Sequence, residues 1–355
     1  MSVSFPSDPA PVLNALRAVY QTRLLVAATH HLDVFEQFRD GPQTLESLSS
    51  TLGLAERPAM VLFPTLCALG FLKRDAATGR LALTETGRAL TRAQEPNLLG
   101  YLEFSAGDPE VLEMAERLRF DGPRVKPEEG TAYVKEGDGP SPMDDPETAR
   151  MLTLRLAGRA RLLSPLTARV LPSAKESKHL VDVAAGSGYY TYEWLLANPL
   201  GTATVFDRPA VLRVAEECLE AFCQEKGESE TKGLRERVRF HPGDMLTDVI
   251  PRADILLSFS LLHDWPTDTC ALLTQRFAAA LNPGGELWVH DEFLDDTLDG
   301  PLTATLYSAQ LFWVTEGRVY SRAEHAGWCS ASGLEVTGIR DTTALNYSLL
   351  SARKV

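Results

Sequence analysis

The chain has 355 residues, of which 44% are hydrophobic and 23% charged, as in ordinary folded globular domains. This length allows about two or three domains with substantial cores. The formal net charge is −13, and an acidic surface repels nucleic-acid phosphates and anionic lipid headgroups. Composition therefore excludes collagen, coiled-coil and disordered classes, and we expect neither a nucleic-acid partner nor a membrane partner.

The cysteines and the first residues indicate the compartment. Five scattered cysteines without a CxxC pair fit neither a disulfide framework nor a zinc site. The opening MSVSFPSDPAPV lacks a basic segment followed by an apolar one, and no stretch approaches about 18 consecutive apolar residues. We therefore expect a cytoplasmic protein with no metal site.

Residues 1–100 are expected to form a mainly helical domain. Apolar residues recur at helical spacing in 11–32, 44–54 and 56–72, and two short strands then flank a turn near Gly79. Helix, helix and hairpin is the order of a winged helix. The third helix carries one arginine, Arg57, beside one acid, so we expect it to pack against an apolar surface rather than to read DNA.

Residues 101–170 are expected to connect two domains. The stretch from about 108 to 145 mixes glycine, proline and charge over a length too great for an ordinary loop, which predicts irregular structure. Residues 145–170 return to helical spacing, and Pro146 suits a first helical turn.

Residues 171–355 alternate strands with helices. The strand candidates are nearly continuous apolar runs, which is typical of a parallel sheet covered on both faces. The pattern predicts a doubly wound α/β domain. The last two strand candidates, 333–341 and 344–354, have no helix between them and are expected to form a hairpin at the edge of the sheet.

The first strand of this domain runs into a glycine-rich turn. Ligands of such sheets bind beyond the carboxyl ends of the strands, where Asp182, Gly186 and Gly188 lie. A single GxG is a weak signal, and Thr191 stands where dinucleotide-binding enzymes place a third glycine or alanine. An NAD site is therefore disfavoured.

The next two strands also end in acids. Asp207 ends the second strand, where a carboxylate can accept both hydroxyl protons of a ribose. Asp244 and Met245 follow the third strand and offer an acid to an exocyclic amine and a thioether to a flat ring. Acids at three successive strand ends, without a phosphate-binding GK[ST], indicate a nucleoside with an amino-acid arm, and S-adenosylmethionine has that shape.

The fourth strand runs into His263, within the letters HDWP. An imidazole with a reference pKa of about 6.5 can take a proton from a hydroxyl near neutral pH. A histidine after an apolar strand is more often structural, but its place beside the other strand ends favours a catalytic base.

The motifs LVDVAAGSG, TVFDRP, HPGDM, LLSFSLLHDWP, LNPGGELWVHDEFL and GRVYSRAEH together resemble the S-adenosylmethionine-dependent O-methyltransferases of the plant caffeate and bacterial natural-product type. The resemblance covers the chain apart from about 108–145. It implies a Rossmann-like catalytic domain, a winged-helix domain that forms an intertwined homodimer, and S-adenosylmethionine as cofactor. It also implies that the histidine of HDW is the general base.

The resemblance implies a role for each matching position. The catalytic residues would be His263 and Asp291. The cofactor contacts would be Asp182, Ala184, Gly186, Gly188, Asp207, Arg208, Gly243, Asp244, Met245, Ser258, Phe259 and Trp265. The acceptor pocket would be lined by Tyr307, Gln310, Phe312 and Trp313.

Several positions depart from the family pattern. Ala184 replaces a glycine, a tolerable change where φ is negative, and Phe259 replaces a lysine of the plant members. Asp291 replaces a glutamate that orients the histidine. The second orienting glutamate falls at Val319, with Glu316 and His290 nearby in sequence as substitutes.

The sequence therefore predicts an O-methyltransferase that acts on a phenol or enol of a small aromatic or polyketide-like secondary metabolite. Three alternatives stay open: methylation of carbon or nitrogen, a non-methylating reaction such as decarboxylation or hydroxylation, and a cofactor-sensing winged-helix regulator.

Overall fold

The structure, a computed structural model, describes residues 10–122, 141–173, 178–342 and 345–355. These residues divide into two compact units. The catalytic unit, as we call it, contains the described residues of 141–292 and 323–355, and the helical unit contains those of 10–122 and 293–322. The sequence-based domain limits, 1–100, 101–170 and 171–355, are drawn differently and stay predictions.

The helical unit begins with the predicted order of helix, helix and hairpin. Its named helices and strands are α1 (Ala10–His30), α2 (Leu45–Leu52), α3 (Glu56–Ala68), β1 (Leu72–Arg74), β2 (Leu81–Leu83), α4 (Glu85–Arg88), α5 (Leu99–Glu103), α6 (Pro109–Phe120) and α11 (Leu302–Val314). Strands β1 and β2 pair antiparallel. The Thr84 hydroxyl accepts a hydrogen bond from the Gly87 N–H at 3.0 Å and so begins α4, a typical N-cap.

Helix α6 corrects one prediction. Irregular structure was expected from about residue 108, yet Pro109–Phe120 is a 12-residue helix with proline in its first turn. Its buried side chains, among them Met114 and Leu118, recur at helical spacing, but the helix also carries three acids and two arginines, which mask the pattern. The rest of that stretch, 123–140, lies outside the described residues.

Helix α3 corrects the expected dimer surface. The apolar segments 44–54 and 61–72 were expected to bury against a second copy of the chain, but Val61, Leu62, Phe63 and Leu66 are fully buried in the chain's own core. Arg57, at its start, donates hydrogen bonds to the carbonyl oxygens of Phe312 and Thr315 at the end of α11. This arginine is therefore engaged within the fold.

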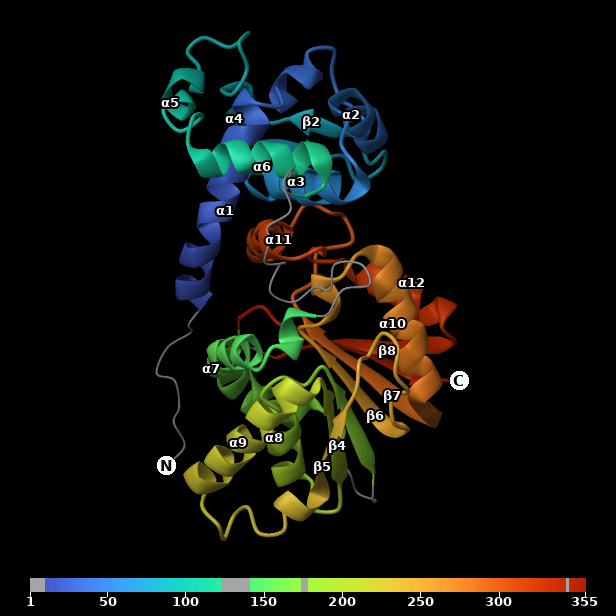
Figure 1. Ribbon diagram of the computed structural model, residues 1–355. Helices are drawn as coiled ribbons and strands as arrows, with labels where there is room; N and C mark the ends of the chain where they lie inside the picture. Colours follow the sequence, from blue (N-terminus) through green and yellow to red (C-terminus); the bar gives the residue numbers. More distant parts are fainter. Residues whose placement is uncertain (1–9, 123–140, 174–177, 343–344) are drawn as a thin grey trace. The chain divides into compact units, whose positions relative to one another are not determined.

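The catalytic unit is built on a seven-stranded sheet of order β5-β4-β3-β6-β7-β9-β8 (Figure 1). Its strands are β3 (His179–Val183), β4 (Thr202–Asp207), β5 (Val238–Pro242), β6 (Ala253–Phe259), β7 (Leu281–Asp291), β8 (Leu334–Asp341) and β9 (Ser348–Lys354). The first five are parallel, whereas β9 pairs antiparallel with both β7 and β8. The predicted doubly wound sheet and its edge hairpin are confirmed.

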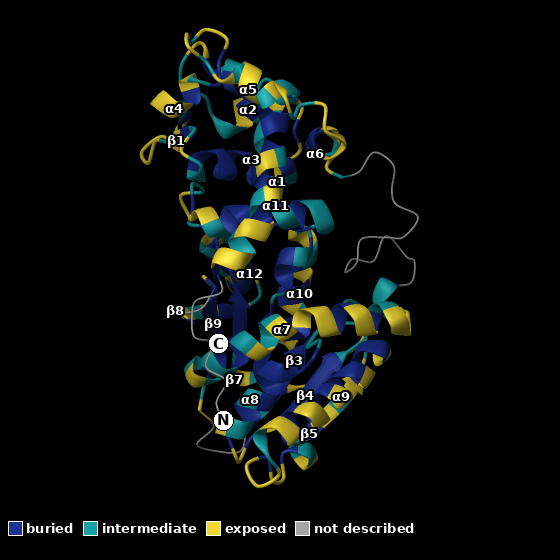
Figure 2. Ribbon diagram, turned by 90° about the vertical axis from the view of Figure 1, so that its left-hand side faces the viewer, coloured by how far each residue is buried: buried dark blue, intermediate teal, exposed yellow. Residues whose placement is uncertain are grey.

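Helices cover both faces of this sheet. They are α7 (Pro146–Val170), α8 (Tyr189–Ala197), α9 (Pro209–Lys226), α10 (Thr267–Ala280) and α12 (Arg322–Ala331). Figure 1 shows α8 and α9 on one face and α10 on the other, which follows from the reversal of strand order between β5 and β6. The inner strands β3, β4 and β6 are largely buried, as Figure 2 shows for β3 and β4, whereas the edge strands β5 and β8 are partly exposed. The carboxyl ends of β3, β4, β5 and β6 therefore meet at one edge.

Helix α7 begins as the sequence predicts. The Asp145 carboxylate accepts a hydrogen bond from the Thr148 N–H at 2.7 Å, and Pro146 occupies the first turn, where its missing N–H costs nothing. Within the described ranges, no helix combines the length and apolarity that a bilayer crossing requires.

Candidate active site

The turn after β3 has an unusual backbone. Ala184, Gly186 and Gly188 have φ angles of 54°, 57° and 75°, all in the left-handed region. A negative φ, the condition under which alanine would be tolerated at position 184 without strain, is therefore not met. A side chain in this conformation costs roughly 1–2 kcal/mol, because Cβ approaches the carbonyl oxygen too closely.

The glycines serve different purposes. No atom lies within 4 Å of the position that a Cβ on Gly186 would take, so a ligand can approach this backbone closely. At Gly188 a Cβ would collide with the Tyr192 hydroxyl, and at Gly243 it would lie 2.6 Å from the Phe206 ring. The last two glycines are thus required for packing, whatever they bind.

Two acids stand beside this turn, of which Asp182 is buried and Asp207 half-buried. Burial raises the pKa of Asp182 to about 7. The hydrogen bond of 2.8 Å that its carboxylate accepts from the Thr191 hydroxyl lowers the pKa, but by less than burial raises it. Burial likewise raises the pKa of Asp207 to about 6. The Asp207 carboxylate accepts hydrogen bonds from the N–H groups of Gly186 at 2.9 Å and Arg208 at 2.7 Å.

Arg208 links the ends of β4 and β5. Its guanidinium bonds to the carboxylates of Asp244, at 2.7 Å, and Asp144, at 2.5 Å. Asp244 also accepts a hydrogen bond from the Leu246 N–H, and the Met245 carbonyl accepts one from Arg276. The predicted positions Asp207, Arg208 and Asp244 therefore lie together.

His263 lies in a short 3-10 helix directly after β6, with a relative exposure of 3%. Its Nδ1 is 2.7 Å from both carboxylate oxygens of Asp291, which ends the neighbouring strand β7. The Asp291 carboxylate is fixed in turn by the Glu292 N–H at 2.8 Å. The predicted pair of histidine and carboxylate is formed, and the neutral ring carries its lone pair on Nε2.

A second carboxylate faces the same ring. Asp264 Oδ1 lies 3.6 Å from His263 Nε2. Burial disfavours a charged His263, but Asp291 and Asp264 outweigh it and raise the pKa of the imidazole above its usual value. Burial raises the pKa of Asp264 to about 6. Asp264 is a site residue that was not predicted from the sequence, although it is the D of the HDW motif.

At the end of β6, Phe259 makes apolar contacts where the plant members of the family have a lysine. Phe259 packs edge-on against Tyr190, with ring centroids 4.9 Å apart, and lies 5.1 Å from the His290 ring. Ser258 has a fully buried hydroxyl without a hydrogen-bond partner among the described residues. The Trp265 carbonyl accepts a hydrogen bond from the Cys270 thiol, which ties the HDW segment to α10.

The proposed second brace of His263 is not supplied by His290. His290 Nε2 lies 3.4 Å from the Thr342 hydroxyl, and burial lowers the pKa of this ring to about 3. Val319 and Glu316 belong to the helical unit, where the Val319 N–H donates to the Ser308 hydroxyl at 3.3 Å.

The predicted pocket residues all lie on α11. Tyr307 and Phe312 are buried, whereas Gln310 and Trp313 are half-buried. The Arg17 guanidinium stacks 3.9 Å from the centre of the Tyr307 ring, and Phe312 belongs to the core of the helical unit. Their role toward an acceptor stays a prediction.

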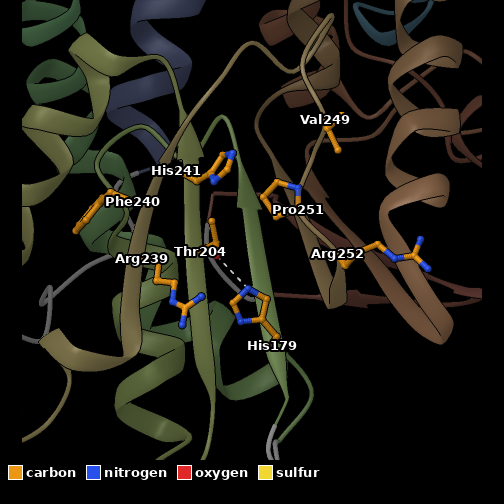
Figure 3. Close-up of a pocket in the computed structure, with 8 residues that line it drawn as sticks. All are labelled: His179, Thr204, Arg239, Phe240, His241, Val249, Pro251 and Arg252. Carbon is orange, nitrogen blue, oxygen red and sulfur yellow. Dashed lines mark hydrogen bonds between the residues drawn. The ribbon is translucent and has the colours of Figure 1, made fainter.

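A groove of about 680 Å³ lies on the face of β3, β4 and β5 (Figure 3). Its lining residues are His179, Thr204, Arg239, Phe240, His241, Val249, Pro251 and Arg252. His179 Nε2 hydrogen-bonds with the Thr204 hydroxyl at 3.0 Å across it. None of the predicted site residues lines this groove.

The parallel sheet places this unit in the doubly wound α/β class, and the glycine turn and the acids at the strand ends suit a nucleoside ligand. A sequence profile of the O-methyltransferase domain matches residues 166–335. An O-methyltransferase family 2 protein from Planctomyces limnophilus DSM 3776, solved in complex with apigenin, is 35% identical and matches 99% of this chain and 97% of its own, with a TM-score of 0.85. The chain belongs to this family and is an S-adenosylmethionine-dependent methyltransferase.

Two curated relatives are also O-methyltransferases. The tetracenomycin polyketide synthesis 8-O-methyl transferase of Streptomyces glaucescens is 29% identical over 94% of this chain and 93% of its own length. The 3-hydroxy-5-methyl-1-naphthoate 3-O-methyltransferase of Streptomyces sahachiroi is 27% identical over 94% of this chain and 91% of its own.

The strand ends fit the cofactor of this family. The open backbone at Gly186 admits a ligand, and the half-buried carboxylate of Asp207 suits the two hydroxyl donors of a ribose. The unpartnered hydroxyl of Ser258 can hydrogen-bond to a polar group. We therefore propose these three residues as cofactor contacts.

The strained turn gives a stability prediction. Replacing Ala184 with glycine should raise the free energy of unfolding by about 0.5 to 1 kcal/mol, because relief of left-handed strain exceeds the added entropy of the unfolded chain. Ala185→Gly is the matched control, because Ala185 does not have a positive φ. Glycine relieves no strain at this position and only adds entropy to the unfolded chain, so this variant should be less stable than the wild type. Urea denaturation measures the free energy of unfolding of both variants. An equal loss of stability in the two would show that Ala184 is not strained.

The pKa of Asp207 gives a binding prediction. Ribose hydroxyls favour the ionised carboxylate, so the affinity for S-adenosylhomocysteine should fall as the pH drops below about 6, by about tenfold per unit. Asp207→Asn should bind at least about tenfold more weakly at neutral pH and lose this pH dependence. Titration calorimetry between about pH 5 and 8 measures this, and a pH-independent affinity of the wild type would refute the assignment.

Proposed function

We propose that the enzyme methylates a phenol or enol oxygen of a small aromatic or polyketide-like metabolite, with His263 as general base. The observation that carries this proposal is the buried pair of His263 Nδ1 and the Asp291 carboxylate, 2.7 Å apart. Bound S-adenosylmethionine supplies an electrophilic methyl group on sulfur, and the protein contributes alignment, exclusion of water and a place for the proton.

The roles of the two residues follow from their hydrogen bonds. Asp291 accepts the Nδ1–H of His263, which fixes the tautomer and turns the basic Nε2 toward the bound acceptor. As the acceptor oxygen gains its methyl group, Nε2 takes the hydroxyl proton. The carboxylates of Asp291 and Asp264 stabilise the imidazolium that forms, which is the effect that raises the pKa of the ring.

The class of acceptor rests on the relatives. One structural relative is described in complex with apigenin, one curated relative acts in tetracenomycin polyketide synthesis, and another methylates a hydroxynaphthoate. All three names point to planar aromatic or polyketide molecules. A phenol of that kind has a proton acidic enough for a histidine to accept.

The central test is removal of the base. His263→Ala should lower turnover by about 10²- to 10⁴-fold and leave the affinity for S-adenosylhomocysteine nearly unchanged, because the ring serves the acceptor. Turnover is measured by transfer of a labelled methyl group to the acceptor. Full activity of this variant would show that another base, or alignment alone, drives the reaction.

The pH profile tests the partner carboxylate. In the wild type, turnover should rise with pH through a pKa above the usual value of about 6.5, since the protonated ring is inactive. Asp291→Asn removes a negative charge beside Nδ1, so the midpoint should move to lower pH while the plateau falls. An unchanged midpoint would contradict the electrostatic role of Asp291.

We further propose that the enzyme is a homodimer that pairs through the helical unit. Its exposed apolar side chains include Val12 and Leu16 of α1, both 63% exposed, and Tyr101 and Phe104, 78% and 86% exposed. Apolar surface of this kind marks an interface. We propose these exposed side chains as the dimer contact, because the segment 61–72 is buried within the chain itself.

Light scattering tests the assembly. The wild type should have about twice the chain mass of 38.9 kDa, and the double variant Leu16→Glu with Phe104→Glu should shift toward the monomer. Leu200→Glu is a control, because Leu200 is also exposed but lies in the catalytic unit. A monomeric wild type at micromolar concentration would rule the dimer out.

A further inference from the structure

The groove on the face of β3, β4 and β5 lies where the connection between two strands contains no helix. Helices α8, α9 and α10 each connect two strands of the sheet, but residues 243–252, which connect β5 to β6, form no helix. Strand β5 is also the edge strand, and its residues Arg239, His241 and Pro242 are exposed. The side chains of the groove are therefore open to a ligand.

The groove is basic, although the chain as a whole has a formal net charge of −13. Four of its eight lining residues are arginine or histidine, and none of the eight is an acid. Arg252 donates a hydrogen bond of 2.7 Å to the Ala279 carbonyl and points away from the groove in Figure 3. Arg239 is thus the arginine whose charge the groove presents, and this charge favours an anion.

Arg239 has an unused guanidinium. Among the residues that the structure describes, its side chain forms neither a hydrogen bond nor an ion pair. Figure 3 shows it directed toward the ring of His179. Burial lowers the pKa of this ring most, the Asp254 carboxylate raises it, and the charge of Arg239 lowers it further, as expected for a nearby cation. The planar N–H donors of Arg239 can therefore bind a ligand in the groove.

His179 and two threonines form the floor of the groove. The ring hydrogen-bonds through Nδ1 with the Thr202 hydroxyl at 2.9 Å and through Nε2 with the Thr204 hydroxyl at 3.0 Å. With its lowered pKa the ring is neutral at pH 7, so one nitrogen donates and the other accepts. The threonine that accepts from the ring keeps its own hydroxyl proton for a ligand. Asp254 does not compete for it, because His179 N–H and Asn282 already donate to its two oxygens.

The other side of the groove is apolar. Val249, which is 85% exposed, and Pro251 lie there on the connection from β5 to β6 (Figure 3). Covering a valine that is this exposed is favourable, because apolar surface leaves water. The volume of about 680 Å³ is within the range of about 300–1,000 Å³ that is typical of pockets for organic molecules. The groove therefore suits an anion that also has an apolar part.

We propose that this groove binds a small organic oxyanion, with its phosphate or carboxylate on Arg239 and its apolar part along Val249 and Pro251. Two oxygens of either group match the planar N–H donors of a guanidinium. None of the candidate catalytic, cofactor or acceptor residues lines the groove. The site is thus separate from the one proposed for methyl transfer, and the proposal does not rest on the proposed function.

Four small molecules test the charge and the apolar part separately. Benzoate and phenyl phosphate carry an oxyanion on a ring, benzamide is the neutral counterpart of benzoate, and inorganic phosphate lacks the ring. Each is titrated by calorimetry into the full-length enzyme saturated with S-adenosylhomocysteine. One of the two ring anions should bind at least about tenfold more tightly than both benzamide and inorganic phosphate. The tighter of the two assigns a phosphate or a carboxylate ligand.

Two results with the wild type overturn the proposal. If benzamide binds as tightly as the ring anions, or if neither ring anion binds, the groove does not select an oxyanion. If inorganic phosphate binds as tightly as the tighter ring anion, the groove takes an adventitious ion only.

Arg239→Gln should weaken the preferred ring anion by about tenfold or more and leave benzamide within about twofold. Arg213→Gln is the matched control, because Arg213 is also an exposed arginine of the catalytic unit but does not line the groove. It removes the same charge and should keep the affinity for the ring anion. An unchanged affinity in Arg239→Gln would show that the anion binds elsewhere.

A pair of variants at Val249 tests the same site from its other side. Val249→Asp places a negative charge in the groove and should weaken the ring anion by about threefold or more relative to Val249→Asn, which differs only in charge. Both variants should fold, because this side chain is 85% exposed. Equal affinities of the two variants would overturn the proposal even if Arg239→Gln does not fold.

Discussion

The candidate site depends on one constraint, which is that charged groups are buried at the carboxyl edge of a parallel sheet. His263 follows β6 and Asp291 ends β7, and these strands are neighbours, so the order of the sheet brings the two side chains together. With relative exposures of 3% and 1%, neither group can exchange its partner for water. Burial therefore holds the pair in a geometry that suits the general base proposed here.

The same burial governs the acids around it. Asp182, Asp207 and Asp264 all have pKa values raised by burial, to about 7, 6 and 6. Their ionised forms gain most when a ligand supplies donors or positive charge. A sheet edge lined with such acids suits a nucleoside with hydroxyl donors and a positively charged sulfonium, which is the character of the family's cofactor.

Much of the fold could be predicted because its inner strands are buried on both faces. The letters TATVFD match β4, and the apolar runs around β3, β6 and β7 mark their strands clearly. The edge hairpin followed from the absence of a helix between the last two strands. Helix α6 was missed because three acids and two arginines interrupt its apolar pattern.

The candidate site could be predicted in part. The residues at strand ends, such as Asp207 and His263, were found because topology alone brings strand ends together. The positive φ of Ala184 could not be seen, since alanine rarely adopts it.

The most direct test of the account is the fate of the methyl group. The enzyme, methyl-labelled S-adenosylmethionine and an aromatic polyketide phenol are incubated together, and the product is analysed by mass spectrometry and NMR. The account predicts one labelled methyl group, bonded to the phenol oxygen, for each S-adenosylhomocysteine formed. Label on carbon or nitrogen, or a changed acceptor without the label, would contradict O-methylation.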